Sequence, residues 1–433
     1  MAEIQKHQEV FDFYLHLTDV IWEIDKVSIE DIITQIKLGF NKFNLIMQYL
    51  INIINIIASH RLWFLEKFVV LCKKIQEIYE ISNDLNFTCF ELKNILIKCN
   101  IITQELSYDY EKKTIDEMYQ IFPKNTITHA LFWDDLLEFQ HLSGSDDFNF
   151  RQTVNFEFLI DMAAKYGAVK CFKLIYLNNA KISIHTLEKS FIGNKFEIIN
   201  ICEQNFSPNR HCIENCVRWY RNDSMQYLKS KYDLDFSFLV SLSSYNFSVF
   251  DQMLNEVNDI EYIDCSGRTA LSSAIEFGFI PVVEYILDKN PQINKIHGKE
   301  NPPLIISLYK YDEKLTKMML DKNFDPNIKN SAGMSALMYA ANTNNINAME
   351  LLLKYKADID KTDNENKTAL IYAIMANFKE GVEFLLKNGA DSTISDNSGK
   401  TPLDYANCID PKSQITKMII KHLESKSSEQ DST

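Results

Sequence analysis

The chain has 433 residues, a formal net charge of −14 at pH 7 and nine cysteines. Its length exceeds one compact core, so we expect several domains or one elongated array of repeats. The acidic balance excludes a general nucleic-acid binder, which needs a basic face. Because the cysteines follow no framework spacing and the first residues form no apolar export segment, we expect reduced thiols and an intracellular location, cytoplasmic rather than nuclear.

Residues 1–122 form an N-terminal region with the composition of helices. Between residues 3 and 122 there is no proline and the only glycine is Gly39, which predicts few helix breaks. Apolar side chains from Val10 to Trp22 predict a first helix, and Ser28 is placed to cap a second. Further helices are predicted over Phe43–Ala58, Leu62–Tyr79 and Phe90–Cys99.

The segment Phe43–Ala58 is apolar enough to raise a second interpretation, a membrane span. Its length falls below the roughly 20 apolar residues that a bilayer needs. Four polar side chains also recur at helical spacing and would form one stripe: Asn44, Gln48, Asn52 and Asn55. We therefore favour a helix that is buried on most of its surface over one that crosses a membrane.

Residues 123–263 contain weak copies of a repeat that begins just after Pro123. Each copy has an apolar residue followed three positions later by a small one: Ile127 with Ala130, Ile160 with Ala163, Leu187 with Ser190, Ile213 with Cys216, and Phe238 with Ser241. The copies from Leu187 onward are more closely spaced, which indicates shortened turns. Between the first two copies, the polar run His141–Asp147 predicts a turn or finger loop.

Residues 264–423 contain five regular copies with a period of 33 residues. Each copy has a leucine, a small residue three positions later, and an apolar pair beginning 15 positions after the leucine. The leucines are Leu271, Leu304, Leu337, Leu370 and Leu403. The small residues are Ala274, Ser307, Ala340, Ala373 and Ala406, and the pairs begin at Ile286, Met319, Leu352, Leu385 and Met418. A fixed period of this length is typical of stacked repeats, because one unit cannot bury both of its faces.

The regular copies also carry turn and cap signals in fixed places. The slot for a tight turn, which needs a positive φ, holds Gly267, Gly333, Asn366 and Gly399. The slot for a helix cap holds Thr269, Thr368 and Thr401. The slot for the end of a second helix holds Asn290, Asn323 and Gly389. We therefore expect two short helices in each copy, with a turn before the first.

The motifs of these copies resemble the ankyrin repeat family. The segments Gly267–Leu271, Lys367–Leu370 and Gly399–Leu403 resemble the turn and the start of the first helix in that family. The segments Leu352–Asp358 and Leu385–Asp391 resemble the end of its second helix. The copy at Leu304 departs from the pattern, since Glu300 replaces the turn glycine and Asn301-Pro302-Pro303 lacks the threonine. The resemblance implies an all-α fold, an α-solenoid of helix-turn-helix units with short β-hairpin or finger loops, preceded by the N-terminal helical region.

The order of the parts adds a second, looser resemblance. A helical region followed by weak and then regular copies is similar to lineage-expanded ankyrin families of protists. The last residues, Glu424–Thr433, are polar without an apolar anchor, and we expect a disordered tail there.

Motifs for catalysis are absent from the sequence, which has no glycine-rich phosphate loop, nucleophile elbow or zinc-protease helix. His211 and Cys212 with Cys216 have the spacing of ligands on neighbouring turns, but Cys216 fills a small-residue slot, where a buried thiol packs. Asp134-Asp135 would diverge on a helix, and Asp146-Asp147 fit turn chemistry. The aromatic residues predicted to pack in the core are Phe132, Trp133, Tyr339, Tyr372 and Tyr405. We expect no enzymatic activity, no metal and no cofactor.

The resemblance implies that partners bind a concave face formed by loop tips and exposed positions of the first helices. Carried onto this chain, the partner-binding residues are Arg268, Glu276, Phe277, Tyr309, Lys310, Met334, Asn342, Thr343, Lys367, Met375 and Lys400. The face combines aromatic residues and methionine, which are enriched in interface cores, with a basic rim of Arg268, Lys367 and Lys400.

We therefore expect a non-enzymatic protein that binds a protein partner on this face and binds neither nucleic acid nor a membrane. The identity of the partner and the oligomeric state stay open. The alternative is an adaptor or scaffold whose N-terminal helices dock to another protein or self-associate while the repeats select cargo.

Overall fold

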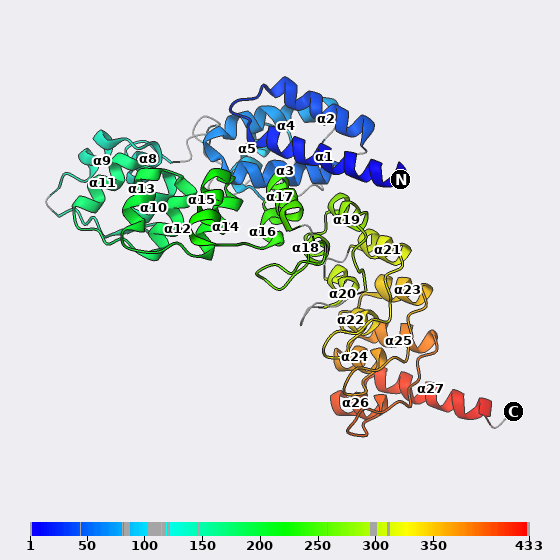
Figure 1. Ribbon diagram of the computed structural model, residues 1–433. Helices are drawn as coiled ribbons and strands as arrows, with labels where there is room; N and C mark the ends of the chain where they lie inside the picture. The colour runs from blue at the N-terminus through cyan, green and yellow to red at the C-terminus, as the bar shows by residue number, and fades with distance from the viewer. Residues whose placement is uncertain are drawn as a thin grey trace. The chain divides into compact units, whose positions relative to one another are not determined.

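The computed structural model describes residues 2–43, 45–79, 81, 87–102, 114, 118, 122–145, 147–257, 259–294, 301–309 and 312–430 (Figure 1). The chain divides into two compact units, Met1–Glu256 and Val257–Thr433. In the described part, nearly all regular structure is helical, as predicted. The predicted division into residues 1–122, 123–263 and 264–423 was based on the type of repeat, whereas the two compact units meet at Glu256 and Val257. The predicted division therefore stays a proposal.

The first unit opens with a block of helices in the predicted places. These are α1 (Ala2–Trp22), α2 (Ile29–Lys42), α3 (Met47–His60), the 3-10 helix η1 (Leu62–Phe64), α4 (Leu65–Tyr79) and α5 (Phe90–Lys98). The Asp31 N–H donates to Ser28 Oγ at 3.1 Å, which confirms the predicted cap of α2. Such a cap stabilises a helix because the first N–H groups have no partner inside it.

Helix α3 confirms the buried helix predicted over Phe43–Ala58, although it begins later, at Met47. Seven of its 14 residues are buried and only Ser59 is exposed; the buried amide of Asn55 accepts the Cys89 N–H through Oδ1 at 3.4 Å. Gln48 and Asn52 pair with each other at 2.7 Å, while Asn44 lies outside the described residues. No helix in the described part of the chain is both long and apolar enough to cross a membrane.

Five helix pairs follow in the first unit, one for each predicted weak copy. They are α8 (Ile127–Trp133) with α9 (Leu136–Leu142), α10 (Leu159–Tyr166) with α11 (Val169–Leu177), α12 (Ile184–Gly193) with α13 (Phe196–Glu203), α14 (Arg210–Arg218) with α15 (Asn222–Tyr232), and α16 (Phe238–Ser243) with α17 (Phe247–Val257). The small residue of each copy is fully buried: Ala130, Ala163, Ser190, Cys216 and Ser241. Small side chains at this slot let neighbouring first helices approach closely.

The finger loop between the first two pairs lies further along the chain than predicted. Helix α9 extends through Leu142, so the start of the predicted loop His141–Asp147 is helical. The hairpin is formed by β1 (Thr153–Val154) and β2 (Glu157–Phe158), antiparallel with Thr153 opposite Phe158. Its turn residues Asn155 and Phe156 both have positive φ, 50° and 65°. This is the sign that the tight two-residue hairpin turn requires.

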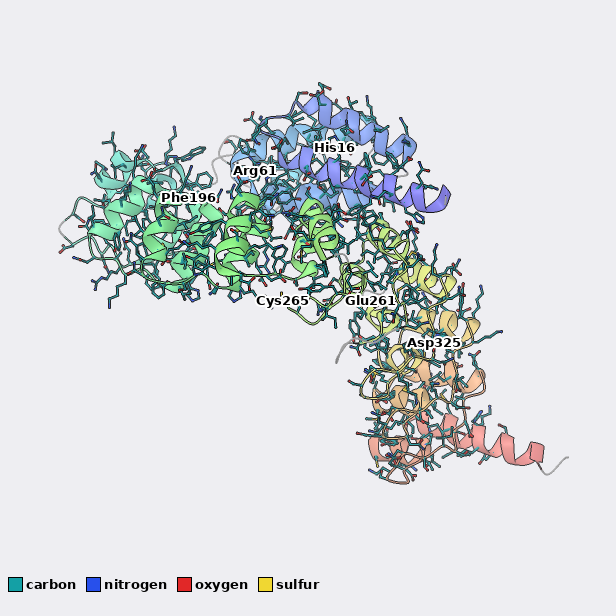
Figure 2. The ribbon with its side chains drawn as sticks, in the orientation of Figure 1. His16, Arg61, Phe196, Glu261, Cys265 and Asp325 are labelled. Carbon is teal, nitrogen blue, oxygen red and sulfur yellow. The ribbon has the colours of Figure 1, made fainter. Side chains whose placement is uncertain are left out.

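The N-terminal block packs against the repeats of its own unit through aromatic side chains. Phe11 of α1 is fully buried, with its ring centroid 6.1 Å from that of Phe247 and 6.3 Å from that of Phe250 in α17. Trp22 stacks on Tyr220 with centroids 4.0 Å apart. Figure 2 shows the side chains that fill this region. The block therefore supplies core to the repeats and is not an independent appendage.

The second unit consists of five further helix pairs, one for each regular copy. They are α18 (Ala270–Phe277) with α19 (Ile280–Leu287), α20 (Pro303–Leu308) with α21 (Glu313–Asp321), α22 (Ala336–Asn342) with α23 (Ile346–Lys354), α24 (Ala369–Met375) with α25 (Lys379–Lys387), and α26 (Pro402–Ile409) with α27 (Gln414–Gln430). The small residues are again buried, from Ala274 to Ala406. Helix α27 continues to Gln430, so the helix passes the predicted start of the tail at Glu424.

Caps at the predicted threonines start the first helices of this unit. Thr269, Thr368 and Thr401 each accept an N–H three positions on, at 3.2, 3.4 and 3.3 Å. The copy at Leu304 has no such cap, because Pro302 occupies the position before α20. Its Leu304 is nevertheless buried, so the copy keeps its place in the stack.

The turns before these helices share one geometry. Gly267, Gly333, Asn366 and Gly399 have φ of 83°, 80°, 62° and 80°, which confirms the predicted slot. Three positions before the glycine or asparagine, an Asp or Asn side chain accepts N–H groups of its own turn: Asp264, Asn330, Asp363 and Asp396. Neighbouring turns are also joined, since the Asn397 N–H donates to the Glu365 carbonyl at 2.8 Å.

Two of these glycines differ in what surrounds them, and this predicts different costs of substitution. A Cβ at Gly333 would lie 2.5 Å from Asn364 Oδ1 and against the Asn364 backbone nitrogen, whereas a Cβ at Gly267 meets nothing within 4 Å. Positive φ alone costs an alanine about 1–2 kcal/mol at either place. Gly333→Ala is therefore expected to lower the free energy of unfolding by about 1–2 kcal/mol more than Gly267→Ala, from the added overlap. Urea unfolding of both variants measures the difference; equal losses would mean that the contact between turns contributes nothing.

Several aromatic residues predicted to pack in the core lie nearer the surface. Trp133 is 61% exposed, so its assignment to the core was wrong; it is the last residue of α8, and the side chain faces solvent. Phe132 and the tyrosines of the regular copies are half-buried. Tyr372 and Tyr405 donate their hydroxyls to Asp363 and Asp396 at 2.7 and 2.6 Å. A tyrosine whose hydroxyl needs an acceptor stays at the edge of a core.

Candidate functional site

The residues considered for metal chemistry have structural roles. Cys212 and Cys216 are fully buried, and burial raises the pKa of the Cys212 thiol to about 12. His211 lies on the outside, with its side chain 69% exposed. In the described ranges, no group of three or more His, Cys, Asp or Glu side chains is arranged to hold a metal ion. Cys216 thus packs inside the protein, in the small-residue slot of its copy.

The paired aspartates also serve the fold. Asp134 accepts the Lys170 and Cys171 N–H groups at 3.0 Å, so it caps helix α11 of the next copy. Asp135 accepts the Glu138 N–H at 3.0 Å and caps its own helix, α9. The two carboxylates therefore point to different helix starts and share no ligand. Asp147 is exposed, and Asp146 lies outside the described residues.

The predicted partner-binding residues fall on two lines that run from copy to copy in the second unit. The turn line, just before the first helix, contains Arg268, Met334, Lys367 and Lys400. The helix-end line, at the end of the first helix, contains Glu276, Phe277, Tyr309, Asn342, Thr343 and Met375. Lys310 lies outside the described residues. Each line repeats every 33 positions, so the helix stack places equivalent positions of successive copies in order.

The structure brings the two lines together within single copies. Arg268 and Glu276 form an ion pair at 2.7 Å, and both side chains are about one-third exposed. In the next copy, the Asn301 side-chain amide donates to the Tyr309 hydroxyl. Asn301 also accepts from Asn330 Nδ2 at 2.7 Å. Asn301 was not among the predicted residues, although it lies 33 residues after Arg268, because the copy at Leu304 departs from the repeat pattern at Asn301-Pro302-Pro303.

The apolar members of these lines differ in exposure. Tyr309 is 41% exposed and Met375 is 45% exposed, whereas Phe277 and Met334 are half-buried. The Tyr309 ring lies against Tyr339 with centroids 4.8 Å apart, and burial raises the pKa of the Tyr309 hydroxyl. Tyr309 is thus held by a ring on one side and an amide at its tip, while much of it faces solvent.

The predicted basic rim is largely neutralised by acidic neighbours. Arg268 is paired with Glu276, and Lys367 Nζ lies 2.5 Å from Glu365, which raises the pKa of Lys367. Lys400 is exposed, with its Nζ 5.9 Å from the centroid of Tyr405. Ion pairs at partly exposed sites are weak. Because Arg268 and Lys367 are already paired, we do not expect the rim to attract a strongly acidic partner.

The turns contribute a network that the sequence did not reveal. The Tyr405 hydroxyl and the Ser398 hydroxyl donate to Asp396, and these bonds hold the pKa of Asp396 well below its usual range. The same bond raises the pKa of Tyr405 to about 12. Because the carboxylate is fixed by several donors, this turn has a defined shape on the turn line, next to Lys400. The sequence feature that could have predicted this network is the acidic residue three positions before the turn glycine, Asp396 before Gly399.

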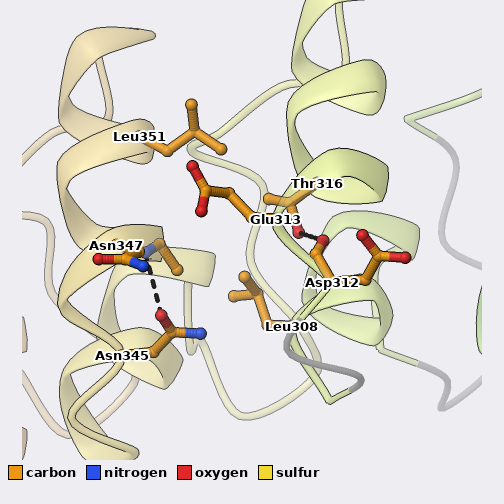
Figure 3. A pocket seen from close by; sticks show the side chains of 8 residues that line it. Leu308, Asp312, Glu313, Thr316, Asn345, Asn347 and Leu351 are labelled. Atoms are coloured by element: carbon orange, nitrogen blue, oxygen red, sulfur yellow. Dashed lines mark hydrogen bonds between the residues drawn. The ribbon is translucent and has the colours of Figure 1, made fainter. Parts of the chain in front are cut away.

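A hollow between the second and third copies shows no chemistry of its own (Figure 3). It has a volume of about 170 Å³ and is lined by α20, α21 and α23 and the residues before them. Its polar groups serve helix starts: Thr316 Oγ1 donates to the Asp312 carbonyl, and Asn345 accepts the Ala348 N–H, both at 3.0 Å. The hollow is therefore a packing feature between copies.

Comparison with known families matches two parts of the chain. A family model described as ankyrin repeats (3 copies) matches residues 304–396, and a model described as a domain of unknown function (DUF3447) matches residues 177–254. The first match spans α20 to α25, and the helix pairs on either side of it repeat the same slots. The second match runs from the end of α11 into α17. No curated protein matches the sequence.

Proposed function

This chain carries ankyrin repeats, and we propose that it binds a protein partner along the turn line and helix-end line of its second unit, without catalysing a reaction. Ankyrin repeats indicate a module for protein interactions. The observation that supports this surface is the exposure of Tyr309 and Met375 at equivalent positions of two copies. Function in a repeat protein has to be argued from such a surface, since the fold alone does not specify it.

The way Tyr309 is held supports its role as an anchor for a partner. Aromatic residues and methionine are enriched in interface cores, and a few such side chains carry most of the binding energy. Tyr309 packs on Tyr339 and is bonded by Asn301, so little side-chain freedom is lost when a partner covers it. The Arg268–Glu276 pair at the neighbouring copy would lie at the polar rim.

Substituting the two exposed anchors tests the proposal. Tyr309→Ala with Met375→Ala is expected to reduce partner capture by at least about tenfold, because truncation of an interface anchor costs about 2 kcal/mol or more. The measurement is affinity capture from lysate with the full chain as bait, quantified by mass spectrometry. A matched control is Phe196→Ala, which removes an aromatic side chain that is 58% exposed in the first unit.

The outcomes separate the two hypotheses. Proteins lost with the double variant and kept with Phe196→Ala would be partners of the proposed surface. If the double variant keeps every protein that the unmodified chain captures, the proposal fails and the adaptor alternative gains support. Thermal unfolding of the double variant should stay cooperative, since both side chains are substantially exposed.

A further inference from the structure

The first unit contains a second feature that can receive a ligand, a polar hollow between the N-terminal block and the repeats. Its volume is about 650 Å³, within the range of small-molecule sites. One wall is the end of α1, another is Arg61 between α3 and η1, and a third is the junction of α14 and α15. Figure 2 labels Arg61 at this place. The stacked rings of Trp22 and Tyr220 also line the hollow.

Most charges around the hollow are already paired within the protein. Glu23 pairs with Lys26 at 2.8 Å, and Asp25 pairs with Arg61 at 2.9 Å. Asp19 accepts the Ser248 hydroxyl at 2.7 Å. These acids are therefore engaged, and together with Asp223 they give the lining four carboxylates against three cations, Lys26, Arg61 and Arg221.

Arg221 is the exception. Its Nε donates to the Ile192 carbonyl at 3.0 Å, but no carboxylate in the described residues forms an ion pair with it. Arg221 is half-buried, and both its burial and the like charge of Arg61 lower its pKa. A buried charge without a counter-charge is unfavourable, so this position favours an incoming anion.

The start of helix α15 adds donors at the same wall. Arg221 is its N-cap residue and provides no side-chain cap. In α11 the equivalent N–H groups are bonded to Asp134. In α15 the corresponding side chain, Asn194, instead accepts the Ser224 hydroxyl at 2.5 Å. The first N–H groups of this 11-residue helix therefore receive no carboxylate from the preceding copy, and the acidic residue in its first turn is Asp223; helix starts favour anions.

We propose that this hollow binds one compact oxyanion, the phosphate or carboxylate group of a small molecule, between Arg221 and the first N–H groups of α15. The planar guanidinium forms paired bonds with either group. Asp223, exposed beside the site, and the acids across the hollow disfavour a polyanion. A small ligand fits both the volume and the single unpaired cation.

Isothermal titration calorimetry of the full chain tests this inference, with inorganic phosphate and acetate as separate probes at low chloride. We expect saturable binding of at least one probe, weakened about tenfold or more by Arg221→Gln, because the charge-assisted bonds are lost. The control is Arg218→Gln, since Arg218 lies three residues earlier, at the end of α14, and is paired with Glu214 at 3.2 Å; it should bind within about twofold of the unmodified chain. Whichever probe binds more tightly identifies the preferred oxyanion.

Two results would overturn the inference. One is the absence of saturable binding for both probes, or equal binding by the unmodified chain and Arg221→Gln. The other is a lower melting temperature of Arg221→Gln at low chloride without phosphate or acetate, including failure to fold, because the inference requires that its charge be uncompensated without ligand. The expected result is an unchanged or higher melting temperature for that variant, together with a rise on adding the preferred probe that only the unmodified chain shows.

Discussion

Replacing Phe11 with alanine is expected to lower the free energy of unfolding of the first unit by about 3–5 kcal/mol. The side chain is fully buried and meets Phe247 and Phe250 of α17, more than 230 residues along the chain. Its removal would leave a cavity on both sides of the contact between the block and the repeats. The loss should therefore appear in helix α17 as well as in α1.

Hydrogen exchange of the full chain distinguishes this from a local effect. Faster exchange of α17 amides in Phe11→Ala is expected, whereas His16→Ala, an exposed change on the same helix, should leave them unchanged within about 0.5 kcal/mol. If α17 exchanges at the same rate in both variants, the block is an independent appendage. The same contacts make deletion of residues 1–122 a poor test of function, since it would expose Phe247 and Phe250.

The repeats could be predicted from the sequence because their physics is local and periodic. A small residue three positions after an apolar one marks the face where neighbouring helices meet, and this slot held even in the weak copies, at Ser190 and Cys216. The turn glycines were predicted for the same reason, since Gly267 and Gly399 need a positive φ whatever surrounds them. Repetition turns a weak local signal into a strong one.

Features that depend on contacts between distant segments could not be predicted. The stacking of Trp22 on Tyr220 and the unpaired charge of Arg221 arise only when the block meets the repeats. The hairpin was missed because its turn, Asn155-Phe156, lacks glycine. The exposure of Trp133 was missed because residue type alone does not say which side of α8 it occupies.

The candidate surface follows the period of the sequence, but the contacts of its side chains do not. The period places Tyr309 and Met375 on one line, and both are exposed. The ion pair of Arg268 with Glu276 joins residues eight positions apart across a turn and a helix, a distance in sequence with no simple pattern. Which charges pair could therefore be learned only from the structure. These ion pairs largely neutralise the predicted basic rim.

Gly193→Ala is expected to destabilise the first unit by about 2–3 kcal/mol, although alanine is the better helix former. Gly193 ends α12, and a Cβ there would lie 2.7 Å from the Gly167 nitrogen and against the Ala164 carbonyl. Both obstacles are backbone atoms of α10 and its cap, so no side chain can move aside. Overpacking costs about 1–3 kcal/mol and more where the backbone has to shift, which exceeds the gain of about 1 kcal/mol in helix preference.

Whether Gly193→Ala lowers or raises the free energy of unfolding shows which contribution is larger, the close packing of α10 against α12 or the helix preference of alanine. Urea unfolding with hydrogen exchange of the α10 and α12 amides measures it, and His185→Ala in the same helix, where the side chain is 72% exposed, is the matched control. If the two first helices approach as closely as their small residues indicate, Gly193→Ala loses stability while the control stays within about 0.5 kcal/mol. A variant as stable as the unmodified chain, or more so, would show that helix preference dominates and that these two copies pack more loosely.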